Sequence, residues 1–522
     1  MPNQEILKLC LEKGFIIDKE LFESLSQIDI SIAKMIIEKI KQTSNERFIT
    51  KTTLFNKIQG GDNIVTSFDN ENKKVVERLF INLGLNIEIK KEKILEKEPK
   101  KEEEEKQDSA SFRIINSYDV PTKKFKVNDF ARHFRNRFLE MKKILQERTE
   151  LQNLVSINKI SGNKQNFSII GAVLNKRTTK NKNILLELED LTGRISVLVN
   201  HDKKEAYEKA KEILLDDIIA VKGSGSSEII FVNDIIYPDI HLSERKKSKK
   251  EEYALFTSDL HVGSLRFLED NFIKFTEWLN GKISNKEEAS KIKYLFITGD
   301  CVDGVGVYPG QEELLKIKDI KKQYEKLAEL LGRIRKDINI ILCPGQHDAV
   351  RVAEPQPAID KTYAQPICDL ENVHLVSNPA VIEIGDAKIN VLMYHGASFH
   401  SFISDIEALR VGKAHETPAK VVKHMLKRRH LAPTHSSVVY VPNESEDPLF
   451  IKKAPDIITT GELHRPDIDI YNNILIICSS CWQSTTPFEE KIGNNPLPCK
   501  VPMLNLKTGA IKILDFSDKE EK

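Results

Sequence analysis

Residues 253–516 alternate short apolar runs with amphipathic stretches. The apolar runs include YALFTSD, KYLFITGD, INIILCPGQHD, KINVLMYHG, PDIITTGELH and ILIICSS. Between them, stretches such as DIKKQYEKLAELLGRIRK repeat apolar residues at three- and four-residue spacing, which is typical of helices. Buried strands that alternate with amphipathic helices predict a layered α/β domain whose sheets are covered on both faces.

Residues 113–245 show a different pattern. A predicted helix over 129–148 carries several basic residues, and a second helix is predicted at Lys203–Ile213. Five short apolar runs are separated by turn sequences: Phe167–Leu174, Ile184–Leu188, Ile195–Val199, Ile218–Val221 and Glu228–Val232. This order predicts an OB-type β-barrel. Only Phe167 and Phe231 are aromatic within these runs, so packing of the barrel is favoured over direct binding of single strands.

The first 112 residues contain no candidate catalytic motif. Residues 1–90 carry a helical period, which predicts a small N-terminal helical domain for docking or interaction. Residues 91–112 lose their apolar content and alternate Lys with Glu, which predicts a flexible charged linker, with a solvated helix as the alternative. The predicted domains are therefore 1–90, a linker at 91–112, 113–245 and 246–522.

Charge and hydropathy narrow the class of protein. Charged residues make up 30% of the chain, yet the net charge is only +1, so a nucleic-acid partner must be met by a local basic face. No apolar run approaches the ~20 residues that span a bilayer, and the N-terminal sequence lacks the features of a signal peptide. Seven scattered cysteines are typical of reduced thiols. We expect a cytoplasmic protein with no membrane partner.

Most apolar runs of the second half end in a short motif rich in acids and histidines. In chain order the motifs are Asp259-Leu260-His261, Gly299-Asp300, Gly345-Gln346-His347-Asp348, His395-Gly396 and Gly461-Glu462-Leu463-His464. Such ligands at strand ends predict a site for two divalent cations. Enzymes that hold two cations about 3.5–4 Å apart use them to cleave phosphodiesters. Asp259 and His261 suit one ion, and Asp300 is placed to bridge both. His347 is the candidate general acid, because imidazole titrates near neutral pH.

The order of these motifs resembles that of the calcineurin-like phosphoesterase superfamily. The blocks GDCVDGVGVYPGQ, AEPQP, SNPA, RHLAP and WQST narrow the resemblance to its polymerase B-subunit branch. Within that branch, residues 113–516 are most similar to the small subunit of archaeal family D DNA polymerase. The resemblance implies a 3′→5′ exonuclease that proofreads the single-stranded primer end of DNA for a large catalytic subunit. A sliding clamp or a primase is a further candidate partner.

The resemblance also implies a ligand set with two departures. The first metal takes Asp259, His261, Asp300 and His464, all of which are present. The second takes Asp300, His395, an Asn and a His, and the last two positions are Gln346 and Glu462 here. Carboxylate and amide oxygens favour Mn²⁺ or Mg²⁺ over Zn²⁺, and Zn²⁺ or Fe is the alternative. An active nuclease is favoured, and a scaffold that retains a decayed site is the alternative. A free-standing phosphatase or repair nuclease fits less well.

A basic stretch around residues 413–435 has three interpretations. Lys427, Arg428 and Arg429 are candidates for contact with nucleic acid or with the large subunit. An ordinary solvated face is the simpler interpretation. The histidines of this stretch are a poor zinc cluster, because no cysteines accompany them.

Overall fold

The computed structural model describes residues 112–118, 124–162, 164–283, 286–443, 445–492 and 494–518, together with scattered positions between Ile6 and Ile49. The chain separates into two compact units, Met1–Glu105 and Lys106–Lys522. Described positions of the first unit include a parallel pair, β1 (Ile16–Ile17) with β2 (Phe48–Ile49). The predicted N-terminal helical domain and charged linker lie largely outside the described residues, so they stay predictions, as do the other domain boundaries.

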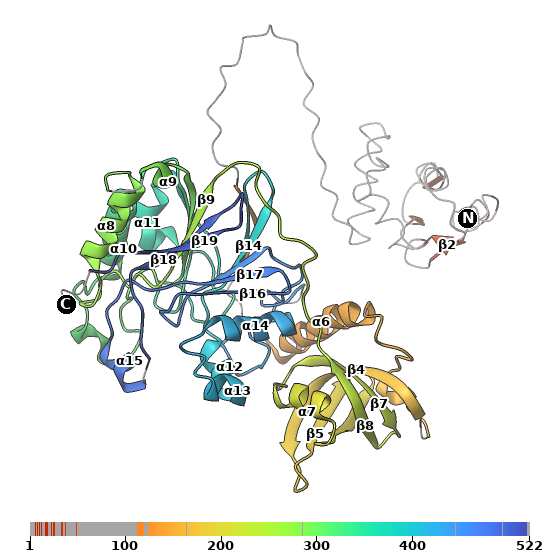
Figure 1. Cartoon of the computed structure of the whole chain (residues 1–522). Coiled ribbons are helices and arrows are strands. Elements are labelled where there is room, and N and C mark those ends of the chain that lie inside the picture. The colour runs from red at the N-terminus through yellow and green to blue at the C-terminus, as the bar shows by residue number, and fades with distance from the viewer. Residues whose placement is uncertain are drawn as a thin grey trace. The chain divides into compact units, whose positions relative to one another are not determined.

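Two six-stranded sheets form the larger domain of the second unit (Figure 1). In spatial order, the first sheet consists of β12 (Val373–Leu375), β11 (Asn339–Cys343), β10 (Ile292–Thr298), β9 (Tyr253–Thr257), β18 (Lys500–Asn505) and β19 (Ile511–Asp515). The first four strands are parallel, and the last two add antiparallel pairs. Parallel strands place their carboxyl ends at one edge of a sheet, which is where the acidic and histidine motifs follow β9, β10 and β11.

The second sheet has the same size and a parallel centre. In spatial order, it consists of β16 (Asp467–Tyr471), β17 (Ile474–Cys478), β15 (Ile457–Thr460), β14 (Ile389–Met393), β13 (Ala380–Ile384) and β3 (Phe112–Ser117). Strand β3 pairs with β13 although more than 250 residues separate them. Residue 113, at which the second predicted domain begins, lies within this strand.

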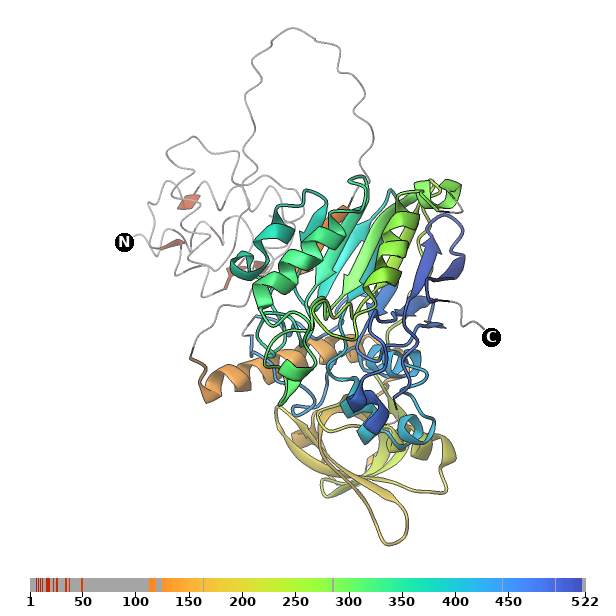
Figure 2. The same cartoon turned by 90° about the vertical axis from the view of Figure 1, so that its left-hand side faces the viewer.

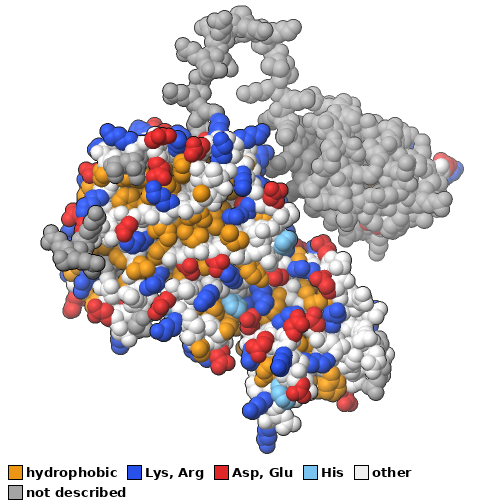
Figure 3. Space-filling view, in the orientation of Figure 1, with side chains coloured by type: hydrophobic (Ala, Val, Ile, Leu, Met, Phe, Trp, Pro, Cys, Tyr) orange, Lys and Arg blue, Asp and Glu red, His pale blue; other side chains and the backbone are white. Residues whose placement is uncertain are grey.

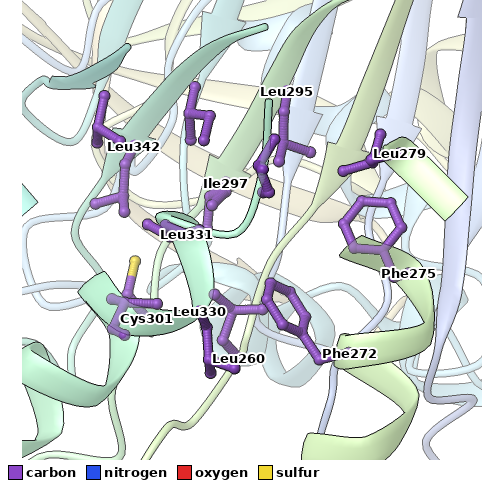
Figure 4. Packing of buried hydrophobic residues seen from close by; sticks show 14 of the residues in the cluster. Leu260, Phe272, Phe275, Leu279, Leu295, Ile297, Cys301, Leu330, Leu331 and Leu342 are labelled. Atoms are coloured by element: carbon purple, nitrogen blue, oxygen red, sulfur yellow. The ribbon is translucent and has the colours of Figure 1, made fainter. Parts of the chain in front are cut away.

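Helices cover the outer faces of both sheets (Figures 1 and 2). Apolar side chains of both sheets pack against each other in one cluster. The first sheet carries α8 (Glu269–Leu279), α9 (Lys286–Ser290), α10 (Ile320–Leu331) and α11 (Lys361–Cys368). The second carries α12 (Phe399–Asp405), α13 (Glu407–Val411) and α14 (Ala419–Arg428). Figure 4 shows Phe272 and Phe275 of α8 in one cluster with Leu295 and Ile297 of β10. The predicted layered α/β domain is confirmed.

The second domain is a closed five-stranded barrel. Its strands run in the order β4 (Lys164–Thr178), β5 (Ile184–Asp190), β6 (Gly193–Val199), β8 (Ile229–Ile236) and β7 (Ile218–Gly225). Helix α7 (Lys204–Lys211) lies between the third and fourth strands of the sequence, as predicted. The barrel encloses its own apolar core. Phe167 is buried in that core and Phe231 is 53% exposed. The OB-fold prediction is confirmed.

Buried ion pairs join the barrel to the α/β domain. The Arg428 guanidinium, at the end of α14, donates to both carboxylate oxygens of Asp217 at 3.0 and 3.1 Å, next to β7. On helix α6 (Val127–Gln146), Arg137 donates to Asp447 at 2.5 Å, while Phe138 packs on the outside of the barrel.

Charges of both signs are interspersed over the face in Figure 3, in keeping with the net charge of +1. Of the described helices, none combines the length and the apolar character that a membrane crossing needs.

Candidate metal centre

The motif residues come together where strands of both sheets end. Asp259 and His261 follow β9, and Asp300 follows β10. From the other sheet, His395 follows β14 and His464 follows β15. Segments up to 205 residues apart in the chain thus present ligand atoms to one place, because both sheets turn the carboxyl ends of their parallel strands toward it.

Nitrogen and oxygen atoms converge on a first point. Nε2 of His261 lies 3.4 Å from Nε2 of His464, which lies 3.3 Å from Oδ1 of Asp259. Two imidazole nitrogens that face each other at this distance gain little as a hydrogen-bonded pair, but they suit a shared cation. Asp259, His261 and His464 form a group whose ligand atoms all lie within 4.8 Å of one another.

A second group lies beside the first and shares Asp259. Nε2 of His395 is 3.3 Å from Oδ2 of Asp300 and 3.9 Å from Oδ1 of Asp259. Nε2 of His395 is also 3.2 Å from Oε2 of Glu462, and the amide of Gln346 donates to the same oxygen at 2.7 Å. Asp300 belongs to a ligand group with His395 and to another with His261, so it can bridge two ions. Gln346 and Glu462, the two residues that depart from the family pattern, are therefore hydrogen-bonded to each other.

Each histidine is oriented through its other ring nitrogen. Nδ1 of His261 lies 3.1 Å from Asp303, Nδ1 of His464 lies 2.7 Å from Glu489, and Nδ1 of His395 lies 2.8 Å from the carbonyl oxygen of Thr298. Such partners fix the ring and direct Nε2 toward a metal. Asp303 and Glu489 were not among the predicted site residues. The Gly-Asp-x-x-Asp spacing is a sequence signal that could have identified Asp303. Glu489 lies on α15 (Pro487–Ile492) and follows no strand, so no sequence signal identifies it.

His347 is held at the edge of the centre. Its backbone N–H donates to Oδ1 of Asp300 at 2.8 Å, and its Nδ1 lies 2.7 Å from the carbonyl oxygen of Asp303. Its ring meets the ring of His261 edge to face, with centroids 4.8 Å apart. Nδ1 donates to that carbonyl, so Nε2 is the atom left to exchange a proton with a substrate.

The backbone at the site adopts conformations that L-residues rarely take. Five predicted site residues have φ between 46° and 71°: Asp259, His261, Asp300, Glu462 and His464. Non-glycine residues in this region cost about 1–3 kcal/mol each and cluster at functional sites. Close approach also explains the glycines, because a Cβ at Gly345 would overlap Oδ1 of Asp300 and one at Gly299 would overlap the ring of His395.

The site keeps its carboxylates ionised. Burial raises the pKa of Asp300, but His395 and His347 outweigh it and hold the pKa well below its usual range. Burial also raises the pKa of Glu462, and His395 and His400 lower it further than burial raises it. Burial lowers the pKa of His395, yet Asp300 and Glu462 raise it well above the ordinary value. The negative charge that a divalent cation requires is therefore present at neutral pH.

The donor set fits divalent cations. Oδ1 of Asp259, Nε2 of His395 and Oε1 of Gln346 are buried, and among the described residues none of them makes a well-formed hydrogen bond, although carboxylate oxygens lie 3.3 and 3.2 Å from Nε2 of His395. Buried polar atoms without partners are costly, and bound cations would satisfy them. Carboxylate, imidazole and amide donors of this kind suit Mn²⁺, Mg²⁺ or Zn²⁺. All seven predicted ligands lie together here, and their roles as ligands stay predictions.

The basic residues of α14 lie elsewhere. Arg428 is 2% exposed and also donates to the carbonyl oxygen of Glu212, while Lys427 donates to the Glu212 carboxylate at 2.6 Å. The Arg429 guanidinium donates to the carbonyl oxygen of Pro238 at 3.0 Å. These cations join α14 to the barrel, so contact with nucleic acid stays a prediction, and burial of Arg428 argues against it for that residue.

Comparisons with known proteins agree with this architecture. A family model for the B subunit of DNA polymerases alpha and epsilon matches residues 254–468, and one described as OB-fold nucleic acid binding domain matches residues 167–227. The solved structure of an archaeal phosphodiesterase covers 50% of this chain and 98% of its own at 12% identity, with a TM-score of 0.25 that is too low to carry an argument. The first of these models indicates that residues 254–468 are similar to the B subunits of DNA polymerases.

Relatives narrow the class. The DNA polymerase II small subunit of Pyrococcus furiosus is 41% identical over 75% of this chain, which spans 64% of that relative, under two thirds of its length. The small subunit of Methanothermobacter thermautotrophicus is 37% identical, with 75% of this chain and 80% of its own covered. That of Archaeoglobus fulgidus is 33% identical over 95% of this chain and 94% of its own. The chain belongs to the family of DNA polymerase II small subunits, which confirms the resemblance to archaeal family D.

Proposed function

We propose that this chain is a two-metal 3′→5′ exonuclease that proofreads for a large catalytic polymerase subunit. The observation that carries the proposal is that oriented imidazoles converge with buried carboxylate and amide oxygens where the strands end. In the proposed assignment, one ion takes Asp259, His261, Asp300 and His464. The other takes Asp300, Gln346, His395 and Glu462.

The proposed reaction is hydrolysis of the last phosphodiester of a primer. When bound, the two cations lower the pKa of the attacking water and stabilise charge on the leaving oxygen. Water adds to phosphorus, the bond from phosphorus to the 3′ oxygen breaks, and that oxygen takes a proton from Nε2 of His347. The products are a nucleoside monophosphate and a primer with a new 3′ hydroxyl. Asp303 keeps His347 in place, since its carbonyl oxygen accepts from Nδ1.

The second cation site is proposed to prefer Mn²⁺ or Mg²⁺, with Zn²⁺ or Fe as alternatives. Glu462 brings a carboxylate, and Gln346 an amide oxygen, to positions where the family has His and Asn. Hard oxygen ligands suit hard cations. Rotation about the last side-chain bond of Gln346 exchanges the positions of its amide oxygen and nitrogen. The group that faces Glu462 can therefore be the oxygen, which can bind a cation, or the nitrogen, which donates to Glu462.

The contact between Gln346 and Glu462 favours a second candidate function. With the amide donating to Oε2 of Glu462 at 2.7 Å, the pair satisfies part of its own polar surface without a cation. Under this alternative the centre is a remnant, and the α/β domain and barrel form a scaffold for the large subunit.

Excision of a mismatched primer end tests the proposal. The intact chain is incubated in Mn²⁺ with a 5′-labelled primer that carries a 3′-terminal mismatch. We expect stepwise shortening by the wild type and none by Asp300→Asn, which removes the bridging charge. Asp202→Asn is the matched control, because its side chain is 75% exposed on the barrel domain.

Calorimetric titration with Mn²⁺ separates the two candidates. A nuclease should bind two ions, and the double variant Gln346→Asn/Glu462→His should bind Zn²⁺ more tightly relative to Mn²⁺ than the wild type does. The scaffold predicts one bound ion or none, and no shortening even when the large subunit is added. That result would replace the nuclease proposal.

A further inference from the structure

The loop that follows Asp300 exposes apolar side chains beside the candidate metal centre. Within residues 302–311, hereafter the site loop, Val305 is 47% exposed, Val307 is 41% exposed and Tyr308 is 39% exposed. Leu265, in the loop after His261, is 58% exposed. Single exposed apolar residues are ordinary, but neighbours that share one short loop next to a polar centre suggest a binding function.

The site loop is held in place by buried glutamines. Gln311 accepts from the backbone N–H of Val307 at 2.9 Å and donates to the carbonyl oxygen of Asp303 at 2.7 Å. Gln323 accepts from the N–H of Gly304 at 2.9 Å and donates back to its carbonyl oxygen at 3.0 Å. Both glutamines are almost completely buried. The exposed side chains are thus presented by a fixed backbone, which lowers the entropic cost of binding.

The same loop packs directly on the candidate general acid. A Cβ at Gly304 would overlap the carbonyl oxygen of His347 and would lie 2.7 Å from Cγ2 of Val307. The Tyr308 ring lies 6.2 Å from the His347 ring, centroid to centroid, at an interplanar angle of 65°. An aromatic ring therefore lies next to the residue that is proposed to protonate the leaving oxygen.

We propose that Tyr308 stacks on the base of the 3′-terminal nucleotide and so positions the phosphodiester that is cleaved. The inference rests on the proposed function. In an exonuclease substrate the terminal base is joined through one sugar to the reacting phosphorus, which suits a ring whose centroid lies 6.2 Å from that of His347. Aromatic stacking does not depend on base identity, as an exonuclease requires. Val305 and Val307 extend the apolar surface beside the ring.

Stacking also gives a reason to select unpaired ends. A base that is paired in a duplex is stacked on its neighbour, and it must leave that stack before it meets Tyr308. A mismatched terminal base leaves at lower cost. The site loop would therefore contribute to proofreading selectivity through the energy of unstacking, without reading the base by hydrogen bonds.

A primer whose 3′-terminal base is 2-aminopurine tests the proposal, since stacking quenches its fluorescence. The last linkage is a phosphorothioate, which slows excision during the measurement. We expect quenching with the wild-type chain and with Tyr308→Phe, which keeps the ring. Tyr308→Ala should restore fluorescence and weaken binding of the primer about 5- to 150-fold, the range of base–aromatic stacking. Tyr363→Ala is the matched control, because Tyr363 is 40% exposed on α11.

An abasic terminal nucleotide provides the second arm. If Tyr308 contacts the base, the loss caused by Tyr308→Ala should vanish on a primer whose 3′-terminal nucleotide has no base. Equal losses on both primers would overturn the inference. So would a Tyr308→Ala chain that quenches normally but loses affinity for the large subunit, which would make the site loop a protein-docking surface.

The two proposals fail separately. If Asp300→Asn abolishes excision while Tyr308→Ala behaves like Tyr363→Ala, the nuclease stands and the stacking role is wrong. If the wild type never shortens a primer but quenches 2-aminopurine through Tyr308, the nuclease proposal is wrong, and the contact between Tyr308 and the base stands without a role in cleavage. Circular dichroism of each variant shows whether the fold is retained.

Discussion

Arg428→Met should destabilise the protein strongly and in a pH-dependent way. Arg428 and Asp217 are 2% exposed each, and the guanidinium also packs over the ring of Tyr237, 5.3 Å from its centroid. Burial raises the pKa of Asp217, and Arg428 is the main group that opposes the increase. Methionine keeps much of the volume of arginine but leaves the Asp217 carboxylate buried without its counter-charge. Breaking one side of a buried ion pair costs about 3–5 kcal/mol.

Protonation of Asp217 sets a ceiling on that cost. Taking an ordinary carboxyl with a pKa near 3.9 to its neutral form costs about 4 kcal/mol at pH 7 and about 1.5 kcal/mol at pH 5, at about 1.36 kcal/mol per pH unit. The folded-state pKa of Asp217 is already raised in the wild type, and in the variant it rises further above the unfolded value. Destabilisation is therefore greatest at high pH and is relieved as the pH falls. We expect losses in free energy of unfolding of about 4 kcal/mol at pH 7 and about 1.5 kcal/mol at pH 5.

Guanidinium unfolding of the intact chain at both pH values measures these losses. The double variant Asp217→Asn/Arg428→Met removes the stranded charge and should recover part of the stability at pH 7, with little pH dependence. Lys427→Met is the control, since its ion pair with Glu212 is about a quarter exposed and exposed pairs contribute at most about 1 kcal/mol. An equal loss for Arg428→Met at both pH values, or no recovery in the double variant, would show that charge burial is not the cause.

Two further predictions concern the site and the response to acid. Gly345→Ala should lower excision on the order of 100-fold and weaken Mn²⁺ binding, because its Cβ would lie 2.2 Å from Oδ1 of Asp300 and must displace that carboxylate. Gly193→Ala, whose Cβ would lie 3.5 Å from its nearest neighbour, should leave both unchanged, and a similar loss in both variants would contradict the reasoning. Burial lowers the pKa of His430 to about 4, so the unfolded chain takes up this proton first. The free energy of unfolding should therefore fall as the pH drops from about 6.5 toward 4, by up to about 1.4 kcal/mol per pH unit. Thermal melts of wild type and His430→Gln across this range test it, and identical slopes would contradict it.

Local patterns in the sequence predicted the layers and the location of the centre. Runs such as KYLFITGD combine a buried strand with acidic residues at its carboxyl end, and parallel strands must bring those ends to one edge. The five short strands of the barrel, with a helix after the third, were recognisable for the same reason: strand period and turn chemistry are local properties. Asp259, His261, Asp300, His395 and His464 were therefore predictable as a group.

Contacts between remote segments, by contrast, were decided by the tertiary structure alone. Glu489 reaches His464 from a helix 25 residues away, and β3 pairs with a strand more than 250 residues further along the chain. The basic stretch around Arg428 predicts a cation on the surface, yet Arg428 is buried against Asp217 of the barrel. The hydrogen bond between Gln346 and Glu462 joins two positions that in the sequence are separate departures from the family pattern. A linear pattern records the spacing of neighbours, but contacts between remote segments depend on how the layers pack, and no local period encodes that packing.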